Sequence, residues 1–232
     1  MTMSYSLKEI ASSLDATNLK LEATRSDIES LCQESLANRV ASVCVYPNSV
    51  PICREILGPG EIGLAAVVGF PSGRYAVASK CLEIEEVAAA GATEIDAVLD
   101  YPALVDGQFN VVAAEASRLA ESCRQAGALS KFIVETCYLD RQQKLDMLHI
   151  CEDAGANFIK TSTGFGSAGA QLEDVQLWAS ERKSDELKIK ASGGIRSRDQ
   201  VVAFLEAGAS RIGLSSAKAV LADGGEASSG AY

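Results

Sequence analysis

The chain of 232 residues contains 47% hydrophobic and 22% charged residues, a composition typical of a globular protein and unlike a fibrous or disordered one. Its formal net charge of −10 repels polyanions, so we expect neither a nucleic-acid surface nor an anionic-membrane surface. The N-terminal residues lack a signal-peptide pattern, and no run of about 18 apolar residues occurs. These features predict a soluble, cytoplasmic protein.

Cysteine and histidine offer little material for metal or nucleophile chemistry. The seven cysteines form no CxxC pair, and an odd number does not suggest a secreted disulfide framework, so we expect reduced thiols. His149 is the single histidine and lies in a helical stretch. A zinc site or a nucleophile–histidine pair is therefore disfavoured, and a structural role is expected for His149.

Short β-branched and apolar runs alternate along the chain with longer segments of helical periodicity. The expected strands are, in chain order, Leu14–Thr17, Ser42–Tyr46, Gly63–Val68, Glu94–Leu99, Lys131–Glu135, Phe158–Thr161, Lys188–Ser192 and Arg211–Leu214. The expected helices include Ser26–Asn38, Val77–Ala90, Val111–Ala126, Arg141–Ala154 and Asp199–Ala207. Four Gly-Ala pairs, beginning at Gly91, Gly127, Gly155 and Gly208, are expected to end helices, because glycine accepts a left-handed conformation.

Strand starts from Ser42 to Arg211 are on average about 28 residues apart, the usual length of one βα unit. Uniform alternation without a linker predicts an α/β fold: one (β/α)₈ TIM barrel spanning residues 1–232, with a short N-terminal helix. We expect residues 1–6 and 222–232 to be flexible termini. The alternative is an open doubly wound sheet, but no GxGxxG motif follows the first strong strand.

Three expected strands carry reactive side chains, at the end of a barrel where active sites lie. These are Asp96 in EIDAV, Lys160 in FIKTSTGFG and Lys190 in KIKASGGIR. Burial and a second nearby ammonium both lower the pKa of a lysine, and a neutral amine can form an imine with a carbonyl. Lys188 shares a face with Lys190 but lies nearer the strand start, so it is left out of the site.

Glycine-rich segments follow the last three expected strands. They contain Gly164, Gly194 and Gly213, the last followed by Ser215 and Ser216. Barrels often bind phosphate between the loops after strands seven and eight, using backbone N–H groups. Arg196 is as readily a surface arginine as a phosphate ligand. Together with the lysines, these segments predict a site for a phosphorylated aldehyde or ketone.

The same residues resemble the deoxyribose-phosphate aldolase family, and the resemblance covers most of the chain in order. It runs through Leu14–Thr17, VCVYP (Val43–Pro47), VVGFPSG (Val67–Gly73), GATEIDAVL (Gly91–Leu99), FIVET (Phe132–Thr136), GANFIKTSTGFG (Gly155–Gly166), KASGGIR (Lys190–Arg196) and GASRIGLSS (Gly208–Ser216). The FIKTSTGFG and KASGGIR segments are the specific ones.

The resemblance implies a TIM-barrel aldolase that cleaves 2-deoxy-D-ribose 5-phosphate to acetaldehyde and D-glyceraldehyde 3-phosphate, in deoxyribonucleotide catabolism, without metal or cofactor. By position, Lys160 matches the Schiff-base lysine, Lys190 the second lysine and Asp96 the proton-transferring acid. Asp15 matches an acid that organises the site. The phosphate-binding positions are matched by Gly164, Gly194, Gly213, Ser215 and Ser216.

Two features depart from the family or extend beyond its core. Many members have His-Thr-Leu after the first-strand aspartate, whereas Asp15 is followed here by Ala16-Thr17-Asn18, so no acid–base role is carried to Ala16. The terminal Tyr232 resembles the aromatic end of some family tails. Cys44 lies in the second expected strand, and an inert buried thiol is the favoured interpretation.

Two alternative functions stay open at this point. One is another Schiff-base aldolase acting on a different phosphorylated sugar, and the other is a non-catalytic barrel that binds phosphosugars. The expected partners are small phosphorylated sugars and aldehydes, with no nucleic acid and no membrane. An exposed apolar face could also support a homodimer.

Overall fold

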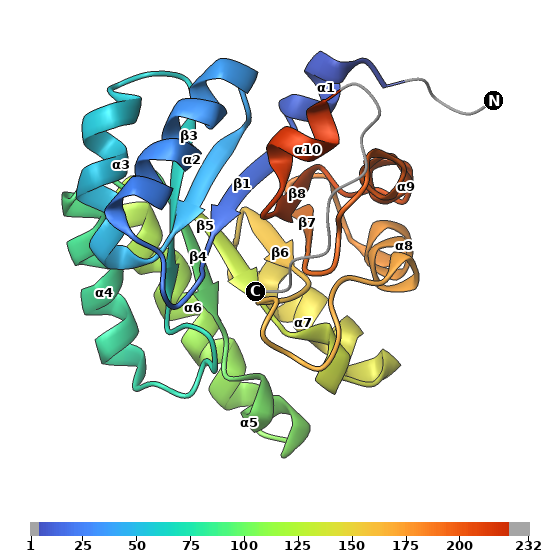
Figure 1. The fold of residues 1–232 in the computed structure, drawn as a ribbon. Helices are drawn as coiled ribbons and strands as arrows, with labels where there is room; N and C mark the ends of the chain where they lie inside the picture. The colour runs from blue at the N-terminus through green and yellow to red at the C-terminus, as the bar shows by residue number, and fades with distance from the viewer. Residues whose placement is uncertain (1–4, 223–232) are drawn as a thin grey trace.

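The computed structural model describes residues 5–222 and shows eight parallel strands closed into a barrel, with helices around the outside (Figure 1). Each strand pairs with the next, and β1 also pairs with β8. The closing pair confirms the predicted TIM barrel and excludes the open doubly wound sheet. Within residues 5–222, no helix is long and apolar enough to cross a bilayer.

The strands agree with the predicted ones to within two residues at each end. They are β1 (Leu14–Asn18), β2 (Ser42–Val45), β3 (Gly63–Val68), β4 (Glu94–Val98), β5 (Leu129–Ile133), β6 (Phe158–Lys160), β7 (Lys188–Ser192) and β8 (Arg211–Leu214). The prediction for β5 began and ended two residues late.

All five predicted helices form, and within residues 5–222 the structure adds five more α-helices. The α-helices are α1 (Leu7–Ala11), α2 (Arg25–Asn38), α3 (Val50–Leu57), α4 (Val77–Ala89), α5 (Tyr101–Val105), α6 (Phe109–Gln125), α7 (Arg141–Asp153), α8 (Leu172–Glu181), α9 (Arg198–Glu206) and α10 (Ala217–Leu221). Two 3₁₀ turns, η1 (Pro47–Ser49) and η2 (Thr136–Tyr138), follow β2 and β5. The expected N-terminal helix is α1; the expected flexible tail beyond Ala222, with Tyr232, lies outside the described residues.

Local sequence explains where many helices begin and end. Capping boxes begin four helices, for example at Thr24 with Asp27 and at Ser197 with Gln200, where side chains satisfy the free N–H groups of the first turn. The glycines of the four Gly-Ala pairs have φ between 68° and 111°. The predicted helix stops at α4, α6, α7 and α9 are therefore confirmed.

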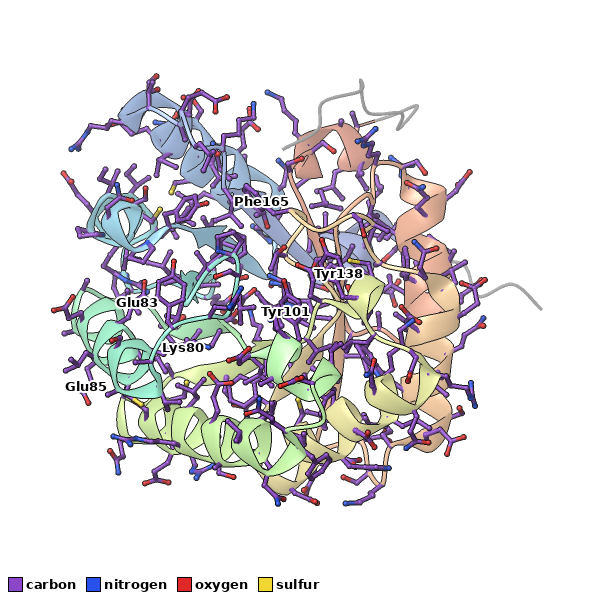
Figure 2. All side chains as sticks on the ribbon, turned by 90° about the horizontal axis from the view of Figure 1, so that it is seen from below. Lys80, Glu83, Glu85, Tyr101, Tyr138 and Phe165 are labelled. Atoms are coloured by element: carbon purple, nitrogen blue, oxygen red, sulfur yellow. The ribbon has the colours of Figure 1, made fainter. Side chains whose placement is uncertain are left out.

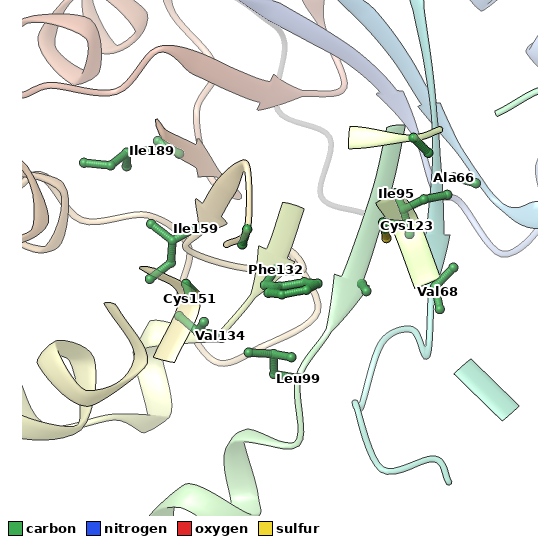
Figure 3. Packing of buried hydrophobic residues seen from close by; sticks show 14 of the residues in the cluster. Ala66, Val68, Ile95, Leu99, Cys123, Phe132, Val134, Cys151, Ile159 and Ile189 are labelled. Atoms are coloured by element: carbon green, nitrogen blue, oxygen red, sulfur yellow. The ribbon is translucent and has the colours of Figure 1, made fainter. Parts of the chain in front are cut away.

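The strand residues alternate between two environments. One set packs against the helices in the main hydrophobic core, including Ile95, Phe132, Ile159 and Ile189 (Figure 3). The other set lies inside the barrel and is apolar only in part: Cys44, Ala65 and Val67 form a small second cluster with Leu19, the residue just after β1. The remaining interior, built mainly from β4 to β8 and β1, contains charged side chains.

Candidate active site

Strand register places the predicted reactive side chains together inside the barrel. Lys160 of β6 is the register partner of Lys190 of β7. Asp96 lies on β4 and Asp15 on β1, and all four side chains are at most 3% exposed. Partners in neighbouring parallel strands point to the same face. The structure therefore brings together the four residues that the sequence selected for catalysis.

One oxygen of Asp96 joins the two lysines. Its Oδ2 accepts hydrogen bonds from Lys160 Nζ and Lys190 Nζ, each at 2.7 Å. The Cys44 thiol lies 3.9 Å from the same oxygen. Lys190 Nζ also contacts Asp15 Oδ2. A carboxylate that is held by two ammonium groups keeps a partner when one of them gives up its proton.

A fifth residue, Lys131, was missed by the sequence reasoning. It is fully buried on β5, in register with Asp96, and its Nζ lies 3.1 Å from both Asp15 Oδ2 and Asp96 Oδ1. It also contacts Glu94. The sequence did hold a signal for Lys131, because it lies in a strand that was expected to be buried. A buried charge is costly unless it is paired, so such a lysine indicates acidic partners inside the barrel.

Arg211 and Glu94 extend the cluster toward the strand starts. Arg211 Nε donates to Asp15 Oδ1 at 2.6 Å, and Arg211 Nη2 donates to Glu94 Oε2 at 2.9 Å. The ring of Phe158 lies 5.9 Å from Lys131 Nζ and 5.8 Å from the Arg211 guanidinium carbon. This arrangement, which we call the charged cluster, consists of Asp15, Glu94, Asp96, Lys131, Lys160, Lys190 and Arg211.

Electrostatics within the charged cluster favour the ionised forms. Burial alone would raise the pKa of Asp15 and Asp96, but the neighbouring lysines, beginning with Lys131, lower both. Burial alone would lower the pKa of Lys160, yet the Asp96 charge and hydrogen bond raise it. The same balance, with Asp15 as the main anion, raises the pKa of Lys190.

This direction corrects the expectation that burial and Lys190 together lower the pKa of Lys160. The physical reason is the contact with Asp96, which favours the ammonium more than desolvation disfavours it. The contact with Asp96 therefore favours the ammonium form of Lys160. The neutral amine of Lys160, which is the nucleophile, must therefore form during the reaction.

Aromatic side chains surround the end of the barrel where these strands terminate. Phe70, in the loop after β3, meets Tyr46 edge to face at 5.8 Å and Phe165 at 5.3 Å between ring centroids. Tyr101 and Tyr138 stack at 5.6 Å. Figure 2 shows Tyr101, Tyr138 and Phe165 near the centre of this view. These ring contacts join the loops that follow β2, β3 and β6, and those that follow β4 and β5.

The five predicted phosphate-binding positions do not share one pocket. Gly194 lines a cavity of about 370 Å³ beside Gly193, and Gly164 lies close to Gly193. Ser215 and Ser216 line a smaller pocket of about 50 Å³. Gly213 lies inside β8 rather than beyond it, and a Cβ there would come within 3.2 Å of Lys190 Cε.

The remaining candidates lie outside the charged cluster. Arg196 is exposed, as is Lys188 at the start of β7, and His149 contacts Glu152 at 3.2 Å on the surface of α7. In the described part of the chain, no group of three or more His, Cys, Asp or Glu side chains is arranged to hold a metal ion. The carboxylates inside the barrel are paired with lysine and arginine instead.

Comparisons with known proteins relate the whole barrel to one family. Residues 10–223 match the model of the DeoC/LacD family aldolase. A deoxyribose-phosphate aldolase from Caldicellulosiruptor saccharolyticus is 44% identical over 93% of this chain and 98% of its own. One from Aciduliprofundum boonei is 42% identical over 90% of this chain and 93% of its own.

Solved structures agree with the sequence comparison. The deoxyribose phosphate aldolase from Aeropyrum pernix, described as a unique tetramer, superposes with a TM-score of 0.85 at 33% identity. The alignment covers 93% of this chain and 91% of that one. The family model and the relatives above 40% identity cover nearly the whole barrel. This chain therefore belongs to the DeoC/LacD family of aldolases.

Proposed function

We propose that the chain is a deoxyribose-phosphate aldolase that reversibly cleaves 2-deoxy-D-ribose 5-phosphate to acetaldehyde and D-glyceraldehyde 3-phosphate through a lysine Schiff base. The relatives named above, which carry that activity in their names, support the substrate. The observation that carries the mechanism is the buried amine of Lys160, which shares one Asp96 oxygen with Lys190. We place the reaction in deoxyribonucleotide breakdown.

The first step requires Lys160 to lose its proton, since only the free amine attacks a carbonyl. The charged cluster contains three carboxylates and four basic groups, so with all of them ionised it holds one excess positive charge. Within the cluster Lys160 pairs with Asp96 alone, whereas Lys131 pairs with every carboxylate. Deprotonation therefore costs least at Lys160.

Attack of the Lys160 amine on C1 of the open-chain sugar and loss of water give a protonated imine. Asp96, with Lys190 on the same oxygen, receives the proton of the C3 hydroxyl. The electrons of that O–H bond form the new C3 aldehyde, and the C2–C3 bond breaks toward the imine. Glyceraldehyde 3-phosphate leaves, and protonation and hydrolysis of the remaining enamine release acetaldehyde and restore Lys160.

We propose that the phosphate of the substrate is bound mainly by neutral donors near Gly164 and Gly194. Glycines there have φ of 91° and 76° and carry no side chain to block approach to the backbone. Among the described residues, the hydroxyl of the buried Ser162 has no hydrogen-bond partner, and its Cβ lies beside Gly193. We propose that Ser215, Ser216 and Gly213 also contribute to phosphate binding. We further propose that the protein is cytoplasmic and forms a homodimer.

The experiment is borohydride reduction of the protein with acetaldehyde, followed by peptide mass mapping. We expect one stable adduct on Lys160, which Lys160→Leu abolishes. Lys188→Leu is the matched control, because Lys188 is an exposed lysine of the neighbouring strand and should leave the adduct unchanged. An adduct on another lysine, or absence of cleavage of 2-deoxyribose 5-phosphate, would overturn the proposal.

A further inference from the structure

Glu135 lies just beyond β5, in a backbone conformation that residues with a side chain rarely adopt. Its φ is 51° and its ψ is 67°, and among residues 5–222 only Arg39 is another non-glycine residue with positive φ. A left-handed conformation is unfavourable for a residue with a Cβ and persists only where surrounding contacts hold it. Arg39 ends α2 as its C-cap, a usual place for this conformation. Glu135 has no such explanation.

The Glu135 carboxylate instead fastens the loop that follows Lys160. The side chain is 1% exposed. Both of its oxygens lie 3.3 Å from the backbone N–H of Thr163, and the Thr163 hydroxyl donates to Oε2. The same hydroxyl accepts from the Phe165 N–H at 3.0 Å. One buried carboxylate thus organises the backbone on both sides of Gly164.

Two further observations show that the loop is built around this side chain. A Cβ on Gly166 would come within 3.0 Å of Glu135 Cδ, so the loop backbone packs directly on the carboxylate. In the described part of the protein no lysine or arginine forms an ion pair with Glu135, and burial raises its pKa. A buried carboxyl without a cation is costly. Its partners are instead a hydroxyl and a backbone N–H of a single loop.

The loop connects the nucleophile to the proposed phosphate site. It begins three residues after Lys160 and contains Gly164, and Phe165 meets Phe70 above the barrel. Backbone hydrogen bonds from Val134 and Thr136 to the segment of Lys160 continue the β5–β6 pairing up to the level of Glu135. Glu135 is therefore anchored to the same strand whose following loop it holds.

We infer that Glu135 is a positioning residue, whose carboxylate holds the loop 163–166 in the arrangement that receives the phosphate-bearing end of the substrate. The inference rests on the proposed function, which it deepens: the left-handed backbone aims the side chain at Thr163, and Thr163 fixes Gly164. Glu135 does not touch the reacting atoms in this assignment. Its loss should weaken binding of the phosphate and spare imine formation.

The test compares Glu135→Gly with Arg39→Gly. Both substitutions relieve a left-handed residue, so Arg39→Gly should melt at or above the wild-type temperature. Glu135→Gly gains the same relief but leaves the Thr163 N–H and hydroxyl without their acceptor, so its melting temperature should be lower than that of Arg39→Gly. Arg39 is exposed at the end of α2, and Arg39→Gly should leave all kinetic constants unchanged. For Glu135→Gly we expect KM for 2-deoxyribose 5-phosphate to rise about tenfold or more, because loosening a binding loop costs affinity. Cleavage of unphosphorylated 2-deoxyribose and borohydride trapping of acetaldehyde should be unchanged.

Equal losses on the phosphorylated and unphosphorylated sugars, or no loss on either, would overturn the inference. If Glu135→Gly does not fold, Glu135→Gln decides, since it keeps the volume but replaces one of the two acceptor oxygens that face Thr163 with an NH₂ donor. A smaller rise in KM, again confined to the phosphorylated sugar, is then expected. Failure of the proposed function can be distinguished from failure of this inference, because in that case the wild-type protein itself would be inactive on 2-deoxyribose 5-phosphate. Inorganic phosphate then serves as the probe: its stabilisation of the wild type should be lost in Glu135→Gly, and equal stabilisation of both would reject the assignment.

Discussion

At the scale of single residues, Lys131 is the side chain that binds the charged cluster together. It pairs with Asp15, Glu94 and Asp96, while no part of it reaches solvent. A buried ion pair gains little over an apolar core of the same volume, but removal of one partner leaves uncompensated buried charge. Lys131 is therefore expected to matter for stability as well as for the site.

Lys131→Met should destabilise the fold by about 3–5 kcal/mol, the usual cost of breaking a buried pair. Urea denaturation measures the free energy of unfolding. Lys188→Met is the control, since Lys188 is exposed and a surface change of this kind costs less than about 0.5 kcal/mol. Similar midpoints for the two variants would contradict the assigned role of Lys131.

Lys190→Leu should raise the apparent pKa of Lys160 and reduce turnover. Lys190 and Lys160 repel each other across the shared Asp96 oxygen, so removing one ammonium makes the other harder to deprotonate. The pH profile of borohydride trapping should move to higher pH. An unchanged profile, with kcat also unchanged, would reject the role given to Lys190.

At the scale of elements, a second buried pair fixes the end of β4, the strand that carries Asp96. Lys80 of α4 donates to Val98 O at 2.7 Å and to Glu115 of α6 at 2.5 Å (Figure 2 labels Lys80). Glu115 in turn accepts from the Asp100 N–H at 2.8 Å. Both side chains are at most 3% exposed. Two helices thereby hold the backbone just beyond Asp96.

Lys80→Met should cost about 3–5 kcal/mol of stability, whereas the double variant Lys80→Met with Glu115→Met should recover most of that loss. The reason is that the single variant leaves the Glu115 carboxylate buried without its cation. Denaturant titration of the four proteins of the cycle gives the coupling between the residues. Additive losses would show that the two side chains act independently.

How far the sequence predicts this molecule depends on the element. Periodicity predicted every strand and the helices α2, α4, α6, α7 and α9, because the βα repeat is regular. Gly-Ala pairs predicted where four of these helices end, whereas α2 ends at Arg39 without a glycine. Strand-end reasoning predicted Asp96, Lys160 and Lys190. It missed Lys131 and Glu135, since one lies in mid-strand and the other depends on a left-handed turn that no residue type announces. Pairs of side chains that are distant in sequence, such as Lys80 and Glu115, could not be predicted either, because only the folded barrel brings them together.

At the scale of the whole molecule, charge is distributed unevenly. The chain carries −10 overall, yet the interior cluster has four basic groups for three carboxylates. Screening weakens the field of the surface charges over about 8 Å at physiological salt, whereas buried charges interact strongly at short range. A negative protein can therefore present a locally positive site to a phosphorylated sugar.

The charged cluster should make stability fall at both ends of the pH scale. Asp15 and Asp96 have lowered pKa in the fold, so their contribution is complete above the ordinary carboxyl pKa and is lost as pH falls below about 4. Lys131, Lys160 and Lys190 have raised pKa, so theirs is complete below about pH 10 and is lost above it. Glu115 and Glu135 have a raised pKa in the fold, so above about pH 4 they bind protons in the folded protein before they do in the unfolded chain. Their contribution therefore increases stability as pH falls, opposite in sign to that of the aspartates.

Urea denaturation across pH 3 to 11 tests this dependence. On the acid side each aspartate contributes a slope of about 1.4 kcal/mol per pH unit, because the unfolded chain binds one more proton there than the folded protein. Asp15→Asn should lower the overall stability and also flatten the acid limb by about that amount. An acid limb of the same slope in Asp15→Asn would mean that Asp15 is not ionised in the fold, and the pairing of Asp15 with Lys190 and Arg211 would then not act as described.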